Sequence, residues 1–266
     1  MTTPDINYPP VVPRAEWLKD RLDFLTKEKE LTAARDRLNT QRRNLPMVRM
    51  DKPYQFEGPA GPASLLDLFA DGSQLIIYHF MWVWEKGQPL EEGCRSCSGW
   101  ADELGPGLRQ SLRARGTTFA LVSRAPLPKI SPFRKRMGWT IPWYSSFGSD
   151  FNYDFGVTLD ESIAPLAYNY RTKAEHEKAG TGYYFGNEDQ PYDLPGTSCF
   201  LRKGEEVFHT YSTYGRGAEA LGGGNAFLDL TALGRQEDWE EPKGRKTGLG
   251  MMAGSPEIKY PDQYGT

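Results

Sequence analysis

Two stretches of the chain are almost unbroken runs of apolar residues, and a segment with helical periodicity follows each of them. Residues 75–82 read Leu-Ile-Ile-Tyr-His-Phe-Met-Trp, and residues 117–123 read Thr-Thr-Phe-Ala-Leu-Val-Ser. Such runs, rich in β-branched and aromatic residues, are typical of strands that are buried on both faces. Residues 100–115 and 129–137 have the pattern of helices, and a glycine follows each. The order strand, helix, strand, helix predicts parallel strands joined by right-handed crossovers.

Residues 14–43 carry leucines at helical spacing within dense charge, among them Leu18, Leu22 and Leu25. The spacing predicts one amphipathic helix of about 30 residues. A proline-rich arm precedes it, so residues 1–45 are expected to form an N-terminal extension. We expect the helix to pack along its own domain. The alternative is that it pairs with a second copy of the chain and makes a homodimer.

Aromatic residues are unusually dense over residues 139–195, where Asp, Asn, Gly and Ser separate them. This composition predicts a long insertion built from turns, with a satellite hydrophobic cluster beneath it; an aromatic cage for a substrate is the alternative. Residues 197–202 and 206–211 predict a β-hairpin, and residues 218–233 a helix interrupted by glycines. Residues 236–266 are rich in Gly, Pro and charge, which predicts a tail that is loosely ordered or draped over the core.

A chain of 266 residues with 38% hydrophobic residues can bury one sizeable core, and we assign it to a single α/β domain over residues 46–235. The net charge of −3 results from 32 basic and 35 acidic residues, which gives no basis for nucleic-acid binding. We find no secretory signal and no run of about 18 apolar residues, so no membrane span is expected. Three cysteines without a signal indicate a reducing, cytoplasmic setting.

The first apolar run leads through a loop, residues 83–93, into a Cys-x-x-Cys pair formed by Cys94 and Cys97. A thiol at the N-terminus of a helix meets unpaired backbone N–H groups and the positive end of the helix dipole, which favour the thiolate. Arg95 acts in the same direction, whereas Glu91 and Glu92 oppose it. We therefore expect a moderately lowered pKa for Cys94.

Arg124 follows the second apolar run directly. Ligands of parallel sheets gather outside the carboxyl ends of the strands, and Cys94 and Arg124 both belong at that edge. We therefore expect Arg124 to hold Cys94 as a thiolate or to bind an anionic group of the substrate. Tyr78 and Trp100 are expected to pack around the site.

A metal site is the alternative interpretation, because Cys-x-x-Cys is also half of a metal-binding set. Soft thiolates select Cu(I), and imidazole or thioether can complete the set. His79 and Met81 share one face of a strand and are the candidate additions to Cys94 and Cys97. A buried histidine that is satisfied by hydrogen bonds is the simpler interpretation of His79. A third alternative is an interaction module, in which the long helix and the aromatic insertion mediate self-association.

Several stretches resemble a bacterial thioredoxin-like family catalogued as domain-of-unknown-function family 899. They include Gly-Cys-Arg-Ser-Cys-Ser at residues 93–98 and Val-Ser-Arg-Ala-Pro-Leu at residues 122–127. The remaining stretches are residues 78–81, 136–139, 142–157, 208–212 and 228–231. Together these similar stretches span nearly the whole chain.

The resemblance implies a thioredoxin-like α/β fold, with a central mixed sheet flanked by helices. It also implies a dithiol–disulfide oxidoreductase with Cys94 as the attacking thiol and Cys97 as the resolving thiol. The partner would be a disulfide or thiol substrate, either protein or small molecule, and no cofactor would be needed. Trp100 is expected to contact that substrate.

Thioredoxins place a cis-proline beside the dithiol, and Pro195 is the nearest candidate here, with Gly196 or Thr197 as alternatives for this substrate-contacting position. The peroxiredoxins are similar in layout but carry a threonine three residues before the reactive cysteine. This chain has Glu91 there, so peroxidase activity is not expected.

Overall fold

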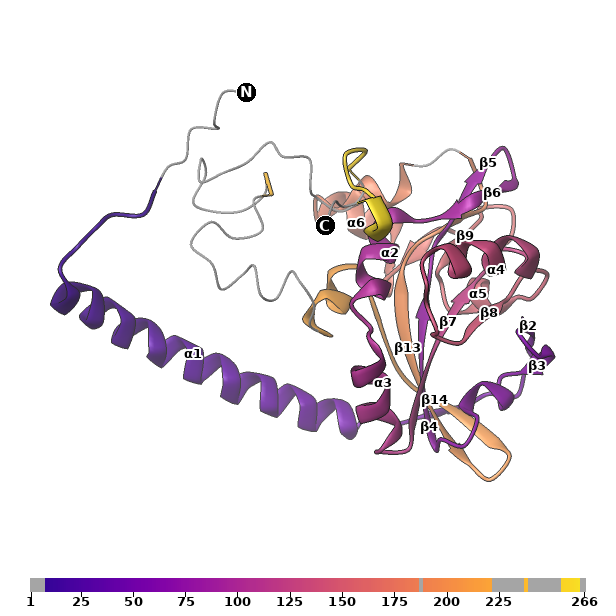
Figure 1. Ribbon diagram of the computed structural model, residues 1–266, viewed down its shortest axis with the longest axis horizontal. Helices are drawn as coiled ribbons and strands as arrows, with labels where there is room; N and C mark the ends of the chain where they lie inside the picture. Colours follow the sequence, from indigo (N-terminus) through magenta and orange to yellow (C-terminus); the bar gives the residue numbers. More distant parts are fainter. Residues whose placement is uncertain (1–7, 187–188, 222–236, 239–254, 264–266) are drawn as a thin grey trace.

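A mixed sheet of eight strands forms the centre of the computed structural model (Figure 1). In spatial order the strands are β1 (Val48–Arg49), β14 (Glu206–Tyr214), β13 (Gly196–Lys203), β4 (Gln74–His79), β7 (Thr117–Ser123), β8 (Trp143–Ser145), β2 (Gln55–Gly58) and β3 (Gly61–Ser64). Strands β4, β7 and β8 are parallel, and β13 is antiparallel to β4. β8 lies within the segment that the sequence assigned to an insertion.

The structure describes residues 8–186, 189–221, 237–238 and 255–263. Most of the predicted helix over residues 218–233 and most of the predicted tail therefore lie outside the described residues. Of the described part of the tail, residues 255–263 pack on the domain.

The connections around β4 give the fold its class. Along the chain, α2 (Arg95–Asp102) and α3 (Pro106–Arg113) come between β4 and β7, and α4 (Leu127–Arg136) comes between β7 and β8. The predicted hairpin is formed by β13 and β14, and it pairs with the other side of β4. Two parallel strands with a helical crossover, flanked by an antiparallel hairpin, make a thioredoxin-like fold, as predicted.

The helix predicted over residues 100–115 is two helices, and the first begins earlier, at Arg95. Gly105 is the N-cap of α3, and Pro106 follows it in the first turn. Proline suits a first turn because it has no N–H to leave unpaired, but it interrupts a helix that would run through it. The Gly-Pro pair therefore explains the break.

Alternating side chains on β4 divide the core between two faces of the sheet. Leu75 and Ile77 belong to a cluster with Phe151 and Phe155, whereas Tyr78 belongs to a second cluster with Cys97, Phe133 and Trp143. Most aromatic residues of the predicted insertion are thus members of these two clusters, whereas Phe147, Tyr170 and Tyr183 are exposed. The prediction of a separate satellite cluster is wrong, because these rings cover the two faces of the central sheet.

The loop predicted over residues 83–93 is a hairpin of β5 (Trp82–Glu85) and β6 (Gln88–Gly93). Lys86 and Gly87 both have positive φ angles, of 49° and 73°. Positive φ at both turn residues is the geometry of the tight turn that suits strand twist. This hairpin stands at one end of the sheet in Figure 1.

Smaller elements complete the described chain. They are the strand pairs β9 (Thr158–Leu159) with β12 (Tyr192–Asp193) and β10 (Ala167–Tyr168) with β11 (Arg171–Thr172), the helices α5 (Phe151–Asp154) and α6 (Lys173–Lys178), and the 3₁₀ turns η1 (Asp67–Phe69), η2 (Gly182–Phe185), η3 (Gly215–Leu221) and η4 (Pro261–Gln263).

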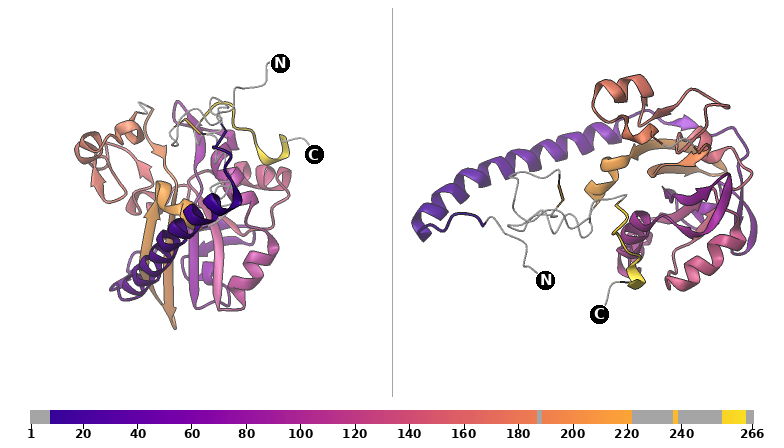
Figure 2. Two further views of the ribbon diagram at one scale, coloured as in Figure 1. Left: turned by 90° about the vertical axis from the view of Figure 1, so that its left-hand side faces the viewer. Right: turned by 90° about the horizontal axis from the view of Figure 1, so that it is seen from above.

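The N-terminal helix α1 (Arg14–Arg43) begins and ends where the sequence predicts. None of its residues is buried, and it projects away from the sheet in Figures 1 and 2. The expectation that it packs along its own domain is therefore wrong. At its C-terminal end the Arg42 guanidinium lies 4.7 Å from the centre of the Tyr211 ring. No helix in the described part of the chain is both long and apolar enough to cross a membrane.

Candidate active site: a dithiol at a helix N-terminus

The β5–β6 hairpin returns the chain to the carboxyl end of β4, where it places Cys94. Trp82 pairs with Gly93, and the Cys94 N–H donates to the Met81 carbonyl at 3.0 Å. Glycine is required before Cys94, because a Cβ at Gly93 would lie 2.5 Å from the Phe80 ring. This close approach lets the hairpin end directly at the start of α2.

Cys94 is the N-cap of α2, with an extended backbone (φ −62°, ψ 130°). The Cys97 N–H donates to the Cys94 sulfur at 3.5 Å. The Ser98 side chain and its N–H both donate to the Cys94 carbonyl, at 2.8 and 2.9 Å. The Cys94 sulfur thus faces the unpaired N–H groups of a helix start, which stabilise negative charge.

The two thiols have opposite tendencies to ionise. The pKa of Cys94 is lowered to about 7, mainly because the Cys97 thiol donates a hydrogen bond to it; burial opposes this, and the N–H groups of Cys97 and Ser96 support it. The pKa of Cys97 is raised well above the usual value by burial and by the neighbouring Cys94. Cys94 is partly exposed and Cys97 is buried, and both are free thiols. The predicted lowering of the Cys94 pKa therefore agrees with the structure.

The two carboxylates before the motif are both paired. Glu91 forms an ion pair with Lys129, and Glu92 forms one with Arg136 at 3.0 Å. Their expected effect on Cys94 is reduced by these partners. The expected stabilisation of the Cys94 thiolate by Arg95 is also reduced, because the Arg95 guanidinium donates to the carbonyls of Pro256 and Ile258 at 3.2 and 3.3 Å.

Tyr78 and Trp100 pack around the dithiol, as expected. The Tyr78 hydroxyl donates to the Cys97 sulfur at 3.3 Å. Its ring stacks on Trp100, with 4.1 Å between the ring centres. Trp100 also lies against Phe119, with 6.1 Å between the ring centres.

Arg124 lies at the predicted edge, but its interactions are with other residues. Its Nε donates to Asp193 Oδ1 at 2.8 Å, and its Nη2 donates to the Pro191 carbonyl at 3.1 Å. The guanidinium also lies 3.8 Å from the centre of the Trp84 ring. Because the group is buried and already paired, the prediction that Arg124 holds the Cys94 thiolate is not supported. No local pattern points to Asp193, which lies 69 residues away along the chain.

The segment predicted to hold the cis-proline lies at the start of β13. The cis peptide among the described residues is Gln190–Pro191, so it is not at Pro195. Gly196 pairs with His79, and Thr197 pairs with Tyr78. Directly paired residues of neighbouring strands share a face, so Thr197 lies on the face of Tyr78 and the dithiol. The Thr197 hydroxyl oxygen is buried there, with no hydrogen-bond partner among the described residues.

His79 lies on the opposite face of the sheet from the dithiol. Its Nε2 is 2.8 Å from the Ser198 hydroxyl, and its ring stacks on Phe151 at 5.5 Å. Burial lowers the pKa of His79 to about 3. Met81 packs with the cluster on the dithiol side. The copper set of Cys94, Cys97, His79 and Met81 is therefore not brought together. The expectation that His79 and Met81 share one face is wrong, because β4 ends at His79 and Met81 no longer follows the alternation of the strand.

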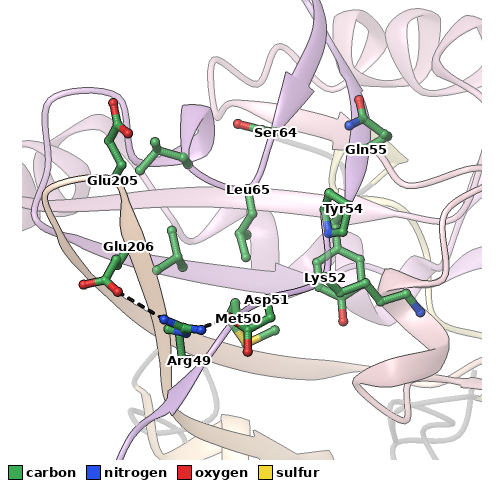
Figure 3. Close-up of a pocket in the computed structure, with 13 residues that line it drawn as sticks. Arg49, Met50, Asp51, Lys52, Tyr54, Gln55, Ser64, Leu65, Glu205 and Glu206 are labelled. Carbon is green, nitrogen blue, oxygen red and sulfur yellow. Dashed lines mark hydrogen bonds and ion pairs between the residues drawn. The ribbon is translucent and has the colours of Figure 1, made fainter.

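Within the described residues, no group of three or more His, Cys, Asp or Glu side chains is arranged to hold a metal ion. A pocket lies instead at the opposite end of the sheet, by the β13–β14 turn (Figure 3). Several of its charged side chains are paired: Arg49 with Asp51 and Glu206, and Lys52 with Asp150 and Asp154.

The fold and the site together define a thioredoxin-like protein with a Cys-x-x-Cys dithiol at a helix N-terminus. The chain belongs to the family described as "Bacterial protein of unknown function (DUF899)", whose model matches residues 6–258. The resemblance seen in the sequence is thereby confirmed. No curated protein matches the chain.

Solved structures with a similar backbone include peroxiredoxins. The peroxidoxin BcpB from Mycobacterium tuberculosis is 12% identical, with 64% of this chain and 84% of that chain covered and a TM-score of 0.40. A cysteine-to-serine mutant of peroxiredoxin Q from Xanthomonas campestris is 13% identical, with 66% and 94% covered and a TM-score of 0.40. A cysteine-to-serine mutant of PrxQ from Xylella fastidiosa is 13% identical, with 66% and 91% covered and a TM-score of 0.39. Likenesses this distant say nothing about activity.

Proposed function

We propose that this protein is a thiol–disulfide oxidoreductase that uses the dithiol of Cys94 and Cys97. The difference between the two sulfurs carries the proposal. Cys94 is partly exposed, caps a helix and has a pKa lowered to about 7, whereas Cys97 is buried and has a raised pKa. Since the thiolate is the attacking species, the geometry supports Cys94 as the nucleophile and Cys97 as the resolving thiol.

The reaction proceeds in two exchanges. The Cys94 thiolate attacks one sulfur of a substrate disulfide; a Cys94–substrate disulfide forms, the substrate S–S bond breaks, and the first substrate sulfur leaves as a thiolate that takes up a proton. Cys97 then loses its proton and attacks the Cys94 sulfur, which releases the second substrate thiol. Two electrons pass to the substrate, and the Cys94–Cys97 disulfide remains. A second dithiol must reduce it before the next cycle.

The surroundings of the dithiol indicate which residues contact the substrate. We assign substrate contacts to Trp100 and to the segment from Pro195 to Thr197, which lies beside β4 at the end that carries the motif. The buried, unpaired hydroxyl of Thr197 supports this assignment, because an unsatisfied buried donor costs about 1–3 kcal/mol unless a bound group pairs with it. The substrate is a protein or small-molecule disulfide.

The test is a redox titration of the purified chain, with thiols trapped at each potential and counted by intact mass. The expected result is a reversible two-electron transition between about −120 and −270 mV, the range of known thiol oxidoreductases. A Cys199→Ser variant should give the same transition, because Cys199 belongs to β13 and not to the dithiol. Cysteines that cannot be trapped until a stoichiometric metal is removed would contradict the proposal, and metal is therefore quantified on the same preparation.

A further inference from the structure

Residues 255–263, here called the C-terminal strap, pack against the start of α2. The strap is drawn in yellow beside α2 in Figure 1 and in the right-hand view of Figure 2. Its η4 turn contacts α2, and Asp262 forms an ion pair with Arg136 of α4 at 2.8 Å. The end of the chain thus meets the beginning of the dithiol helix.

Tyr260 anchors this contact. Only 1% of its surface is exposed. Its hydroxyl lies 2.8 Å from the Gly93 carbonyl oxygen and 2.9 Å from Glu92 Oε2. Two guanidinium groups lie near its ring centre, that of Arg95 at 5.3 Å and that of Arg136 at 4.8 Å. Both oxygens that the hydroxyl reaches belong to the two residues directly before Cys94.

The peptide group between Gly93 and Cys94 is consequently held at both ends. Its carbonyl shares the single proton of the Tyr260 hydroxyl with Glu92 Oε2, and its N–H donates to the Met81 carbonyl at 3.0 Å. Hydrogen bonds that run through one peptide group polarise each other and fix its plane. The orientation of this peptide sets the direction in which the Cys94 side chain leaves the backbone at the N-cap.

The Tyr260 hydroxyl also reduces the effect of the negative charge of Glu92. Glu92 is a carboxylate two residues from the attacking sulfur, and a nearby negative charge disfavours a thiolate. Arg136 and the Tyr260 hydroxyl are its partners. Removing the hydroxyl leaves Glu92 with one partner fewer, so the loss of orientation and the loss of charge screening both make the Cys94 thiolate less stable.

We propose that Tyr260 is a positioning residue for Cys94, which acts through the Gly93 carbonyl and through Glu92. This inference rests on the proposed function, since it concerns the same nucleophile. The titratable and charged groups around the two residues are Cys97 and Tyr78 on the dithiol side, Glu91, Glu92 and Arg95 next to the motif, Lys129 and Arg136 on α4, and Asp262 on the strap.

The test compares Tyr260→Phe with the wild-type chain. Phenylalanine keeps the ring packed against Phe133, where the ring centres are 5.6 Å apart, so the fold is retained; circular dichroism checks this. Alkylation of Cys94 by iodoacetamide is followed against pH by peptide mass spectrometry. The expected result is a shift of the alkylation midpoint upward by about 0.5–1 pH unit, which slows the reaction about three- to tenfold at pH values below the midpoint.

Two further variants make the test specific. Tyr183→Phe is the matched control, because Tyr183 is 67% exposed and distant in sequence from the motif; its profile should equal that of the wild type. Glu92→Gln combined with Tyr260→Phe should recover part of the shift, because it removes the carboxylate that has lost one of its two partners. A purely structural role would instead expose Cys97 to alkylation as well.

The outcomes separate the two proposals. If the wild-type midpoint is near 7 and Tyr260→Phe leaves it unchanged, the role of Tyr260 is overturned and the proposed function stands. If the wild-type midpoint lies at the ordinary thiol value of about 8.5, the proposed function loses its main support, whatever the variant does.

Discussion

Two polar groups follow neighbouring strands of the same sheet, and they differ in how far their bonding capacity is used. Cys94 follows β4 through a hairpin, and Arg124 follows β7 directly. Arg124 is buried and held by Asp193, by the Pro191 carbonyl and by the ring of Trp84. Cys94 is partly exposed, and its sulfur accepts hydrogen bonds from donors at the start of its own helix.

The difference separates a buried ion pair from a thiol whose pKa is lowered. Asp193 accepts from Arg124 and from the Thr158 hydroxyl at 2.8 Å each, and from the Trp84 indole N–H at 3.1 Å. A carboxylate and a guanidinium used in this way join β7, β12 and the β5–β6 hairpin. Cys94 has a thiol whose pKa is lowered, and the residue is partly exposed; a stabilised thiolate that a substrate can reach is what the proposed attack requires.

The largest effect is expected when the dithiol itself is broken. Cys94→Ser should abolish disulfide reduction, because serine at this position supplies no thiolate. Cys97→Ser should still attack but should stop at the mixed disulfide, because the resolving thiol is missing. The measurement is turnover of a model disulfide together with intact mass after a single addition of substrate.

Cys199→Ser is the control, since Cys199 has a pKa that burial raises to about 11 and lies in the middle of β13. Full turnover by Cys94→Ser, or a stable adduct on Cys94→Ser rather than on Cys97→Ser, would contradict the assigned roles.

The next largest effect is expected when the ion pair of Arg124 and Asp193 is broken. Arg124→Met removes one partner of an ion pair whose side chains are 7% and 3% exposed, which leaves Asp193 buried without its cation. Losing one partner of such a pair typically costs about 3–5 kcal/mol. We therefore expect a clear loss of stability in chemical unfolding, with an unchanged pH profile of Cys94 alkylation in the folded protein.

The matched control for that experiment is Arg113→Met. Arg113 pairs with Asp71, but their side chains are 70% and 67% exposed, so solvent already screens the pair. Its unfolding midpoint should stay close to that of the wild type. If Arg124→Met instead raised the alkylation midpoint of Cys94 and left stability unchanged, Arg124 would belong to the catalytic site after all.

Local patterns predict the buried strands, α1 and the dithiol, but not the β5–β6 hairpin, the break between α2 and α3 or the strand β8. Apolar runs mark the buried strands, leucine spacing marks α1, and a cysteine at a helix start marks the thiolate. The face of the sheet on which a side chain lies, and the residues that it contacts, are harder to predict from local patterns. Proximity along the chain groups His79 with Cys94, although strand alternation turns His79 to the other face.

Long-range partners explain the remaining errors. Asp193 and Tyr260 lie 69 and 167 residues from the groups that they bind, Arg124 and Gly93, and no spacing rule connects such positions. Such contacts follow from the packed fold rather than from any local pattern.

The smallest expected effect tests whether the environment of the second thiol is also tuned. The Tyr78 hydroxyl donates to Cys97 at 3.3 Å and lowers a pKa that burial raises. Tyr78→Phe keeps the stacking on Trp100 and removes only this donor, which is worth about 1 kcal/mol, or about fivefold in rate. The Cys97 thiolate becomes scarcer, so the second exchange should slow about fivefold, while the first attack by Cys94 keeps its rate.

Rapid mixing with a disulfide that releases a coloured thiol separates the two steps, because the first release reports attack and the second reports resolution. Since Cys97 has a raised pKa, the rate of the second step should rise with pH in the wild type and in Tyr78→Phe. The ratio of the two rates should stay constant from about pH 6 to about pH 8. Tyr192→Phe is the control, as its hydroxyl donates to the Tyr184 carbonyl and not to a sulfur. Equal slowing of both steps would mean that the Tyr78 hydroxyl supports the fold and does not tune Cys97. Slowing of the second step alone would show that the Tyr78 hydroxyl acts on Cys97 and not on Cys94, so that the two thiols of the dithiol are tuned separately.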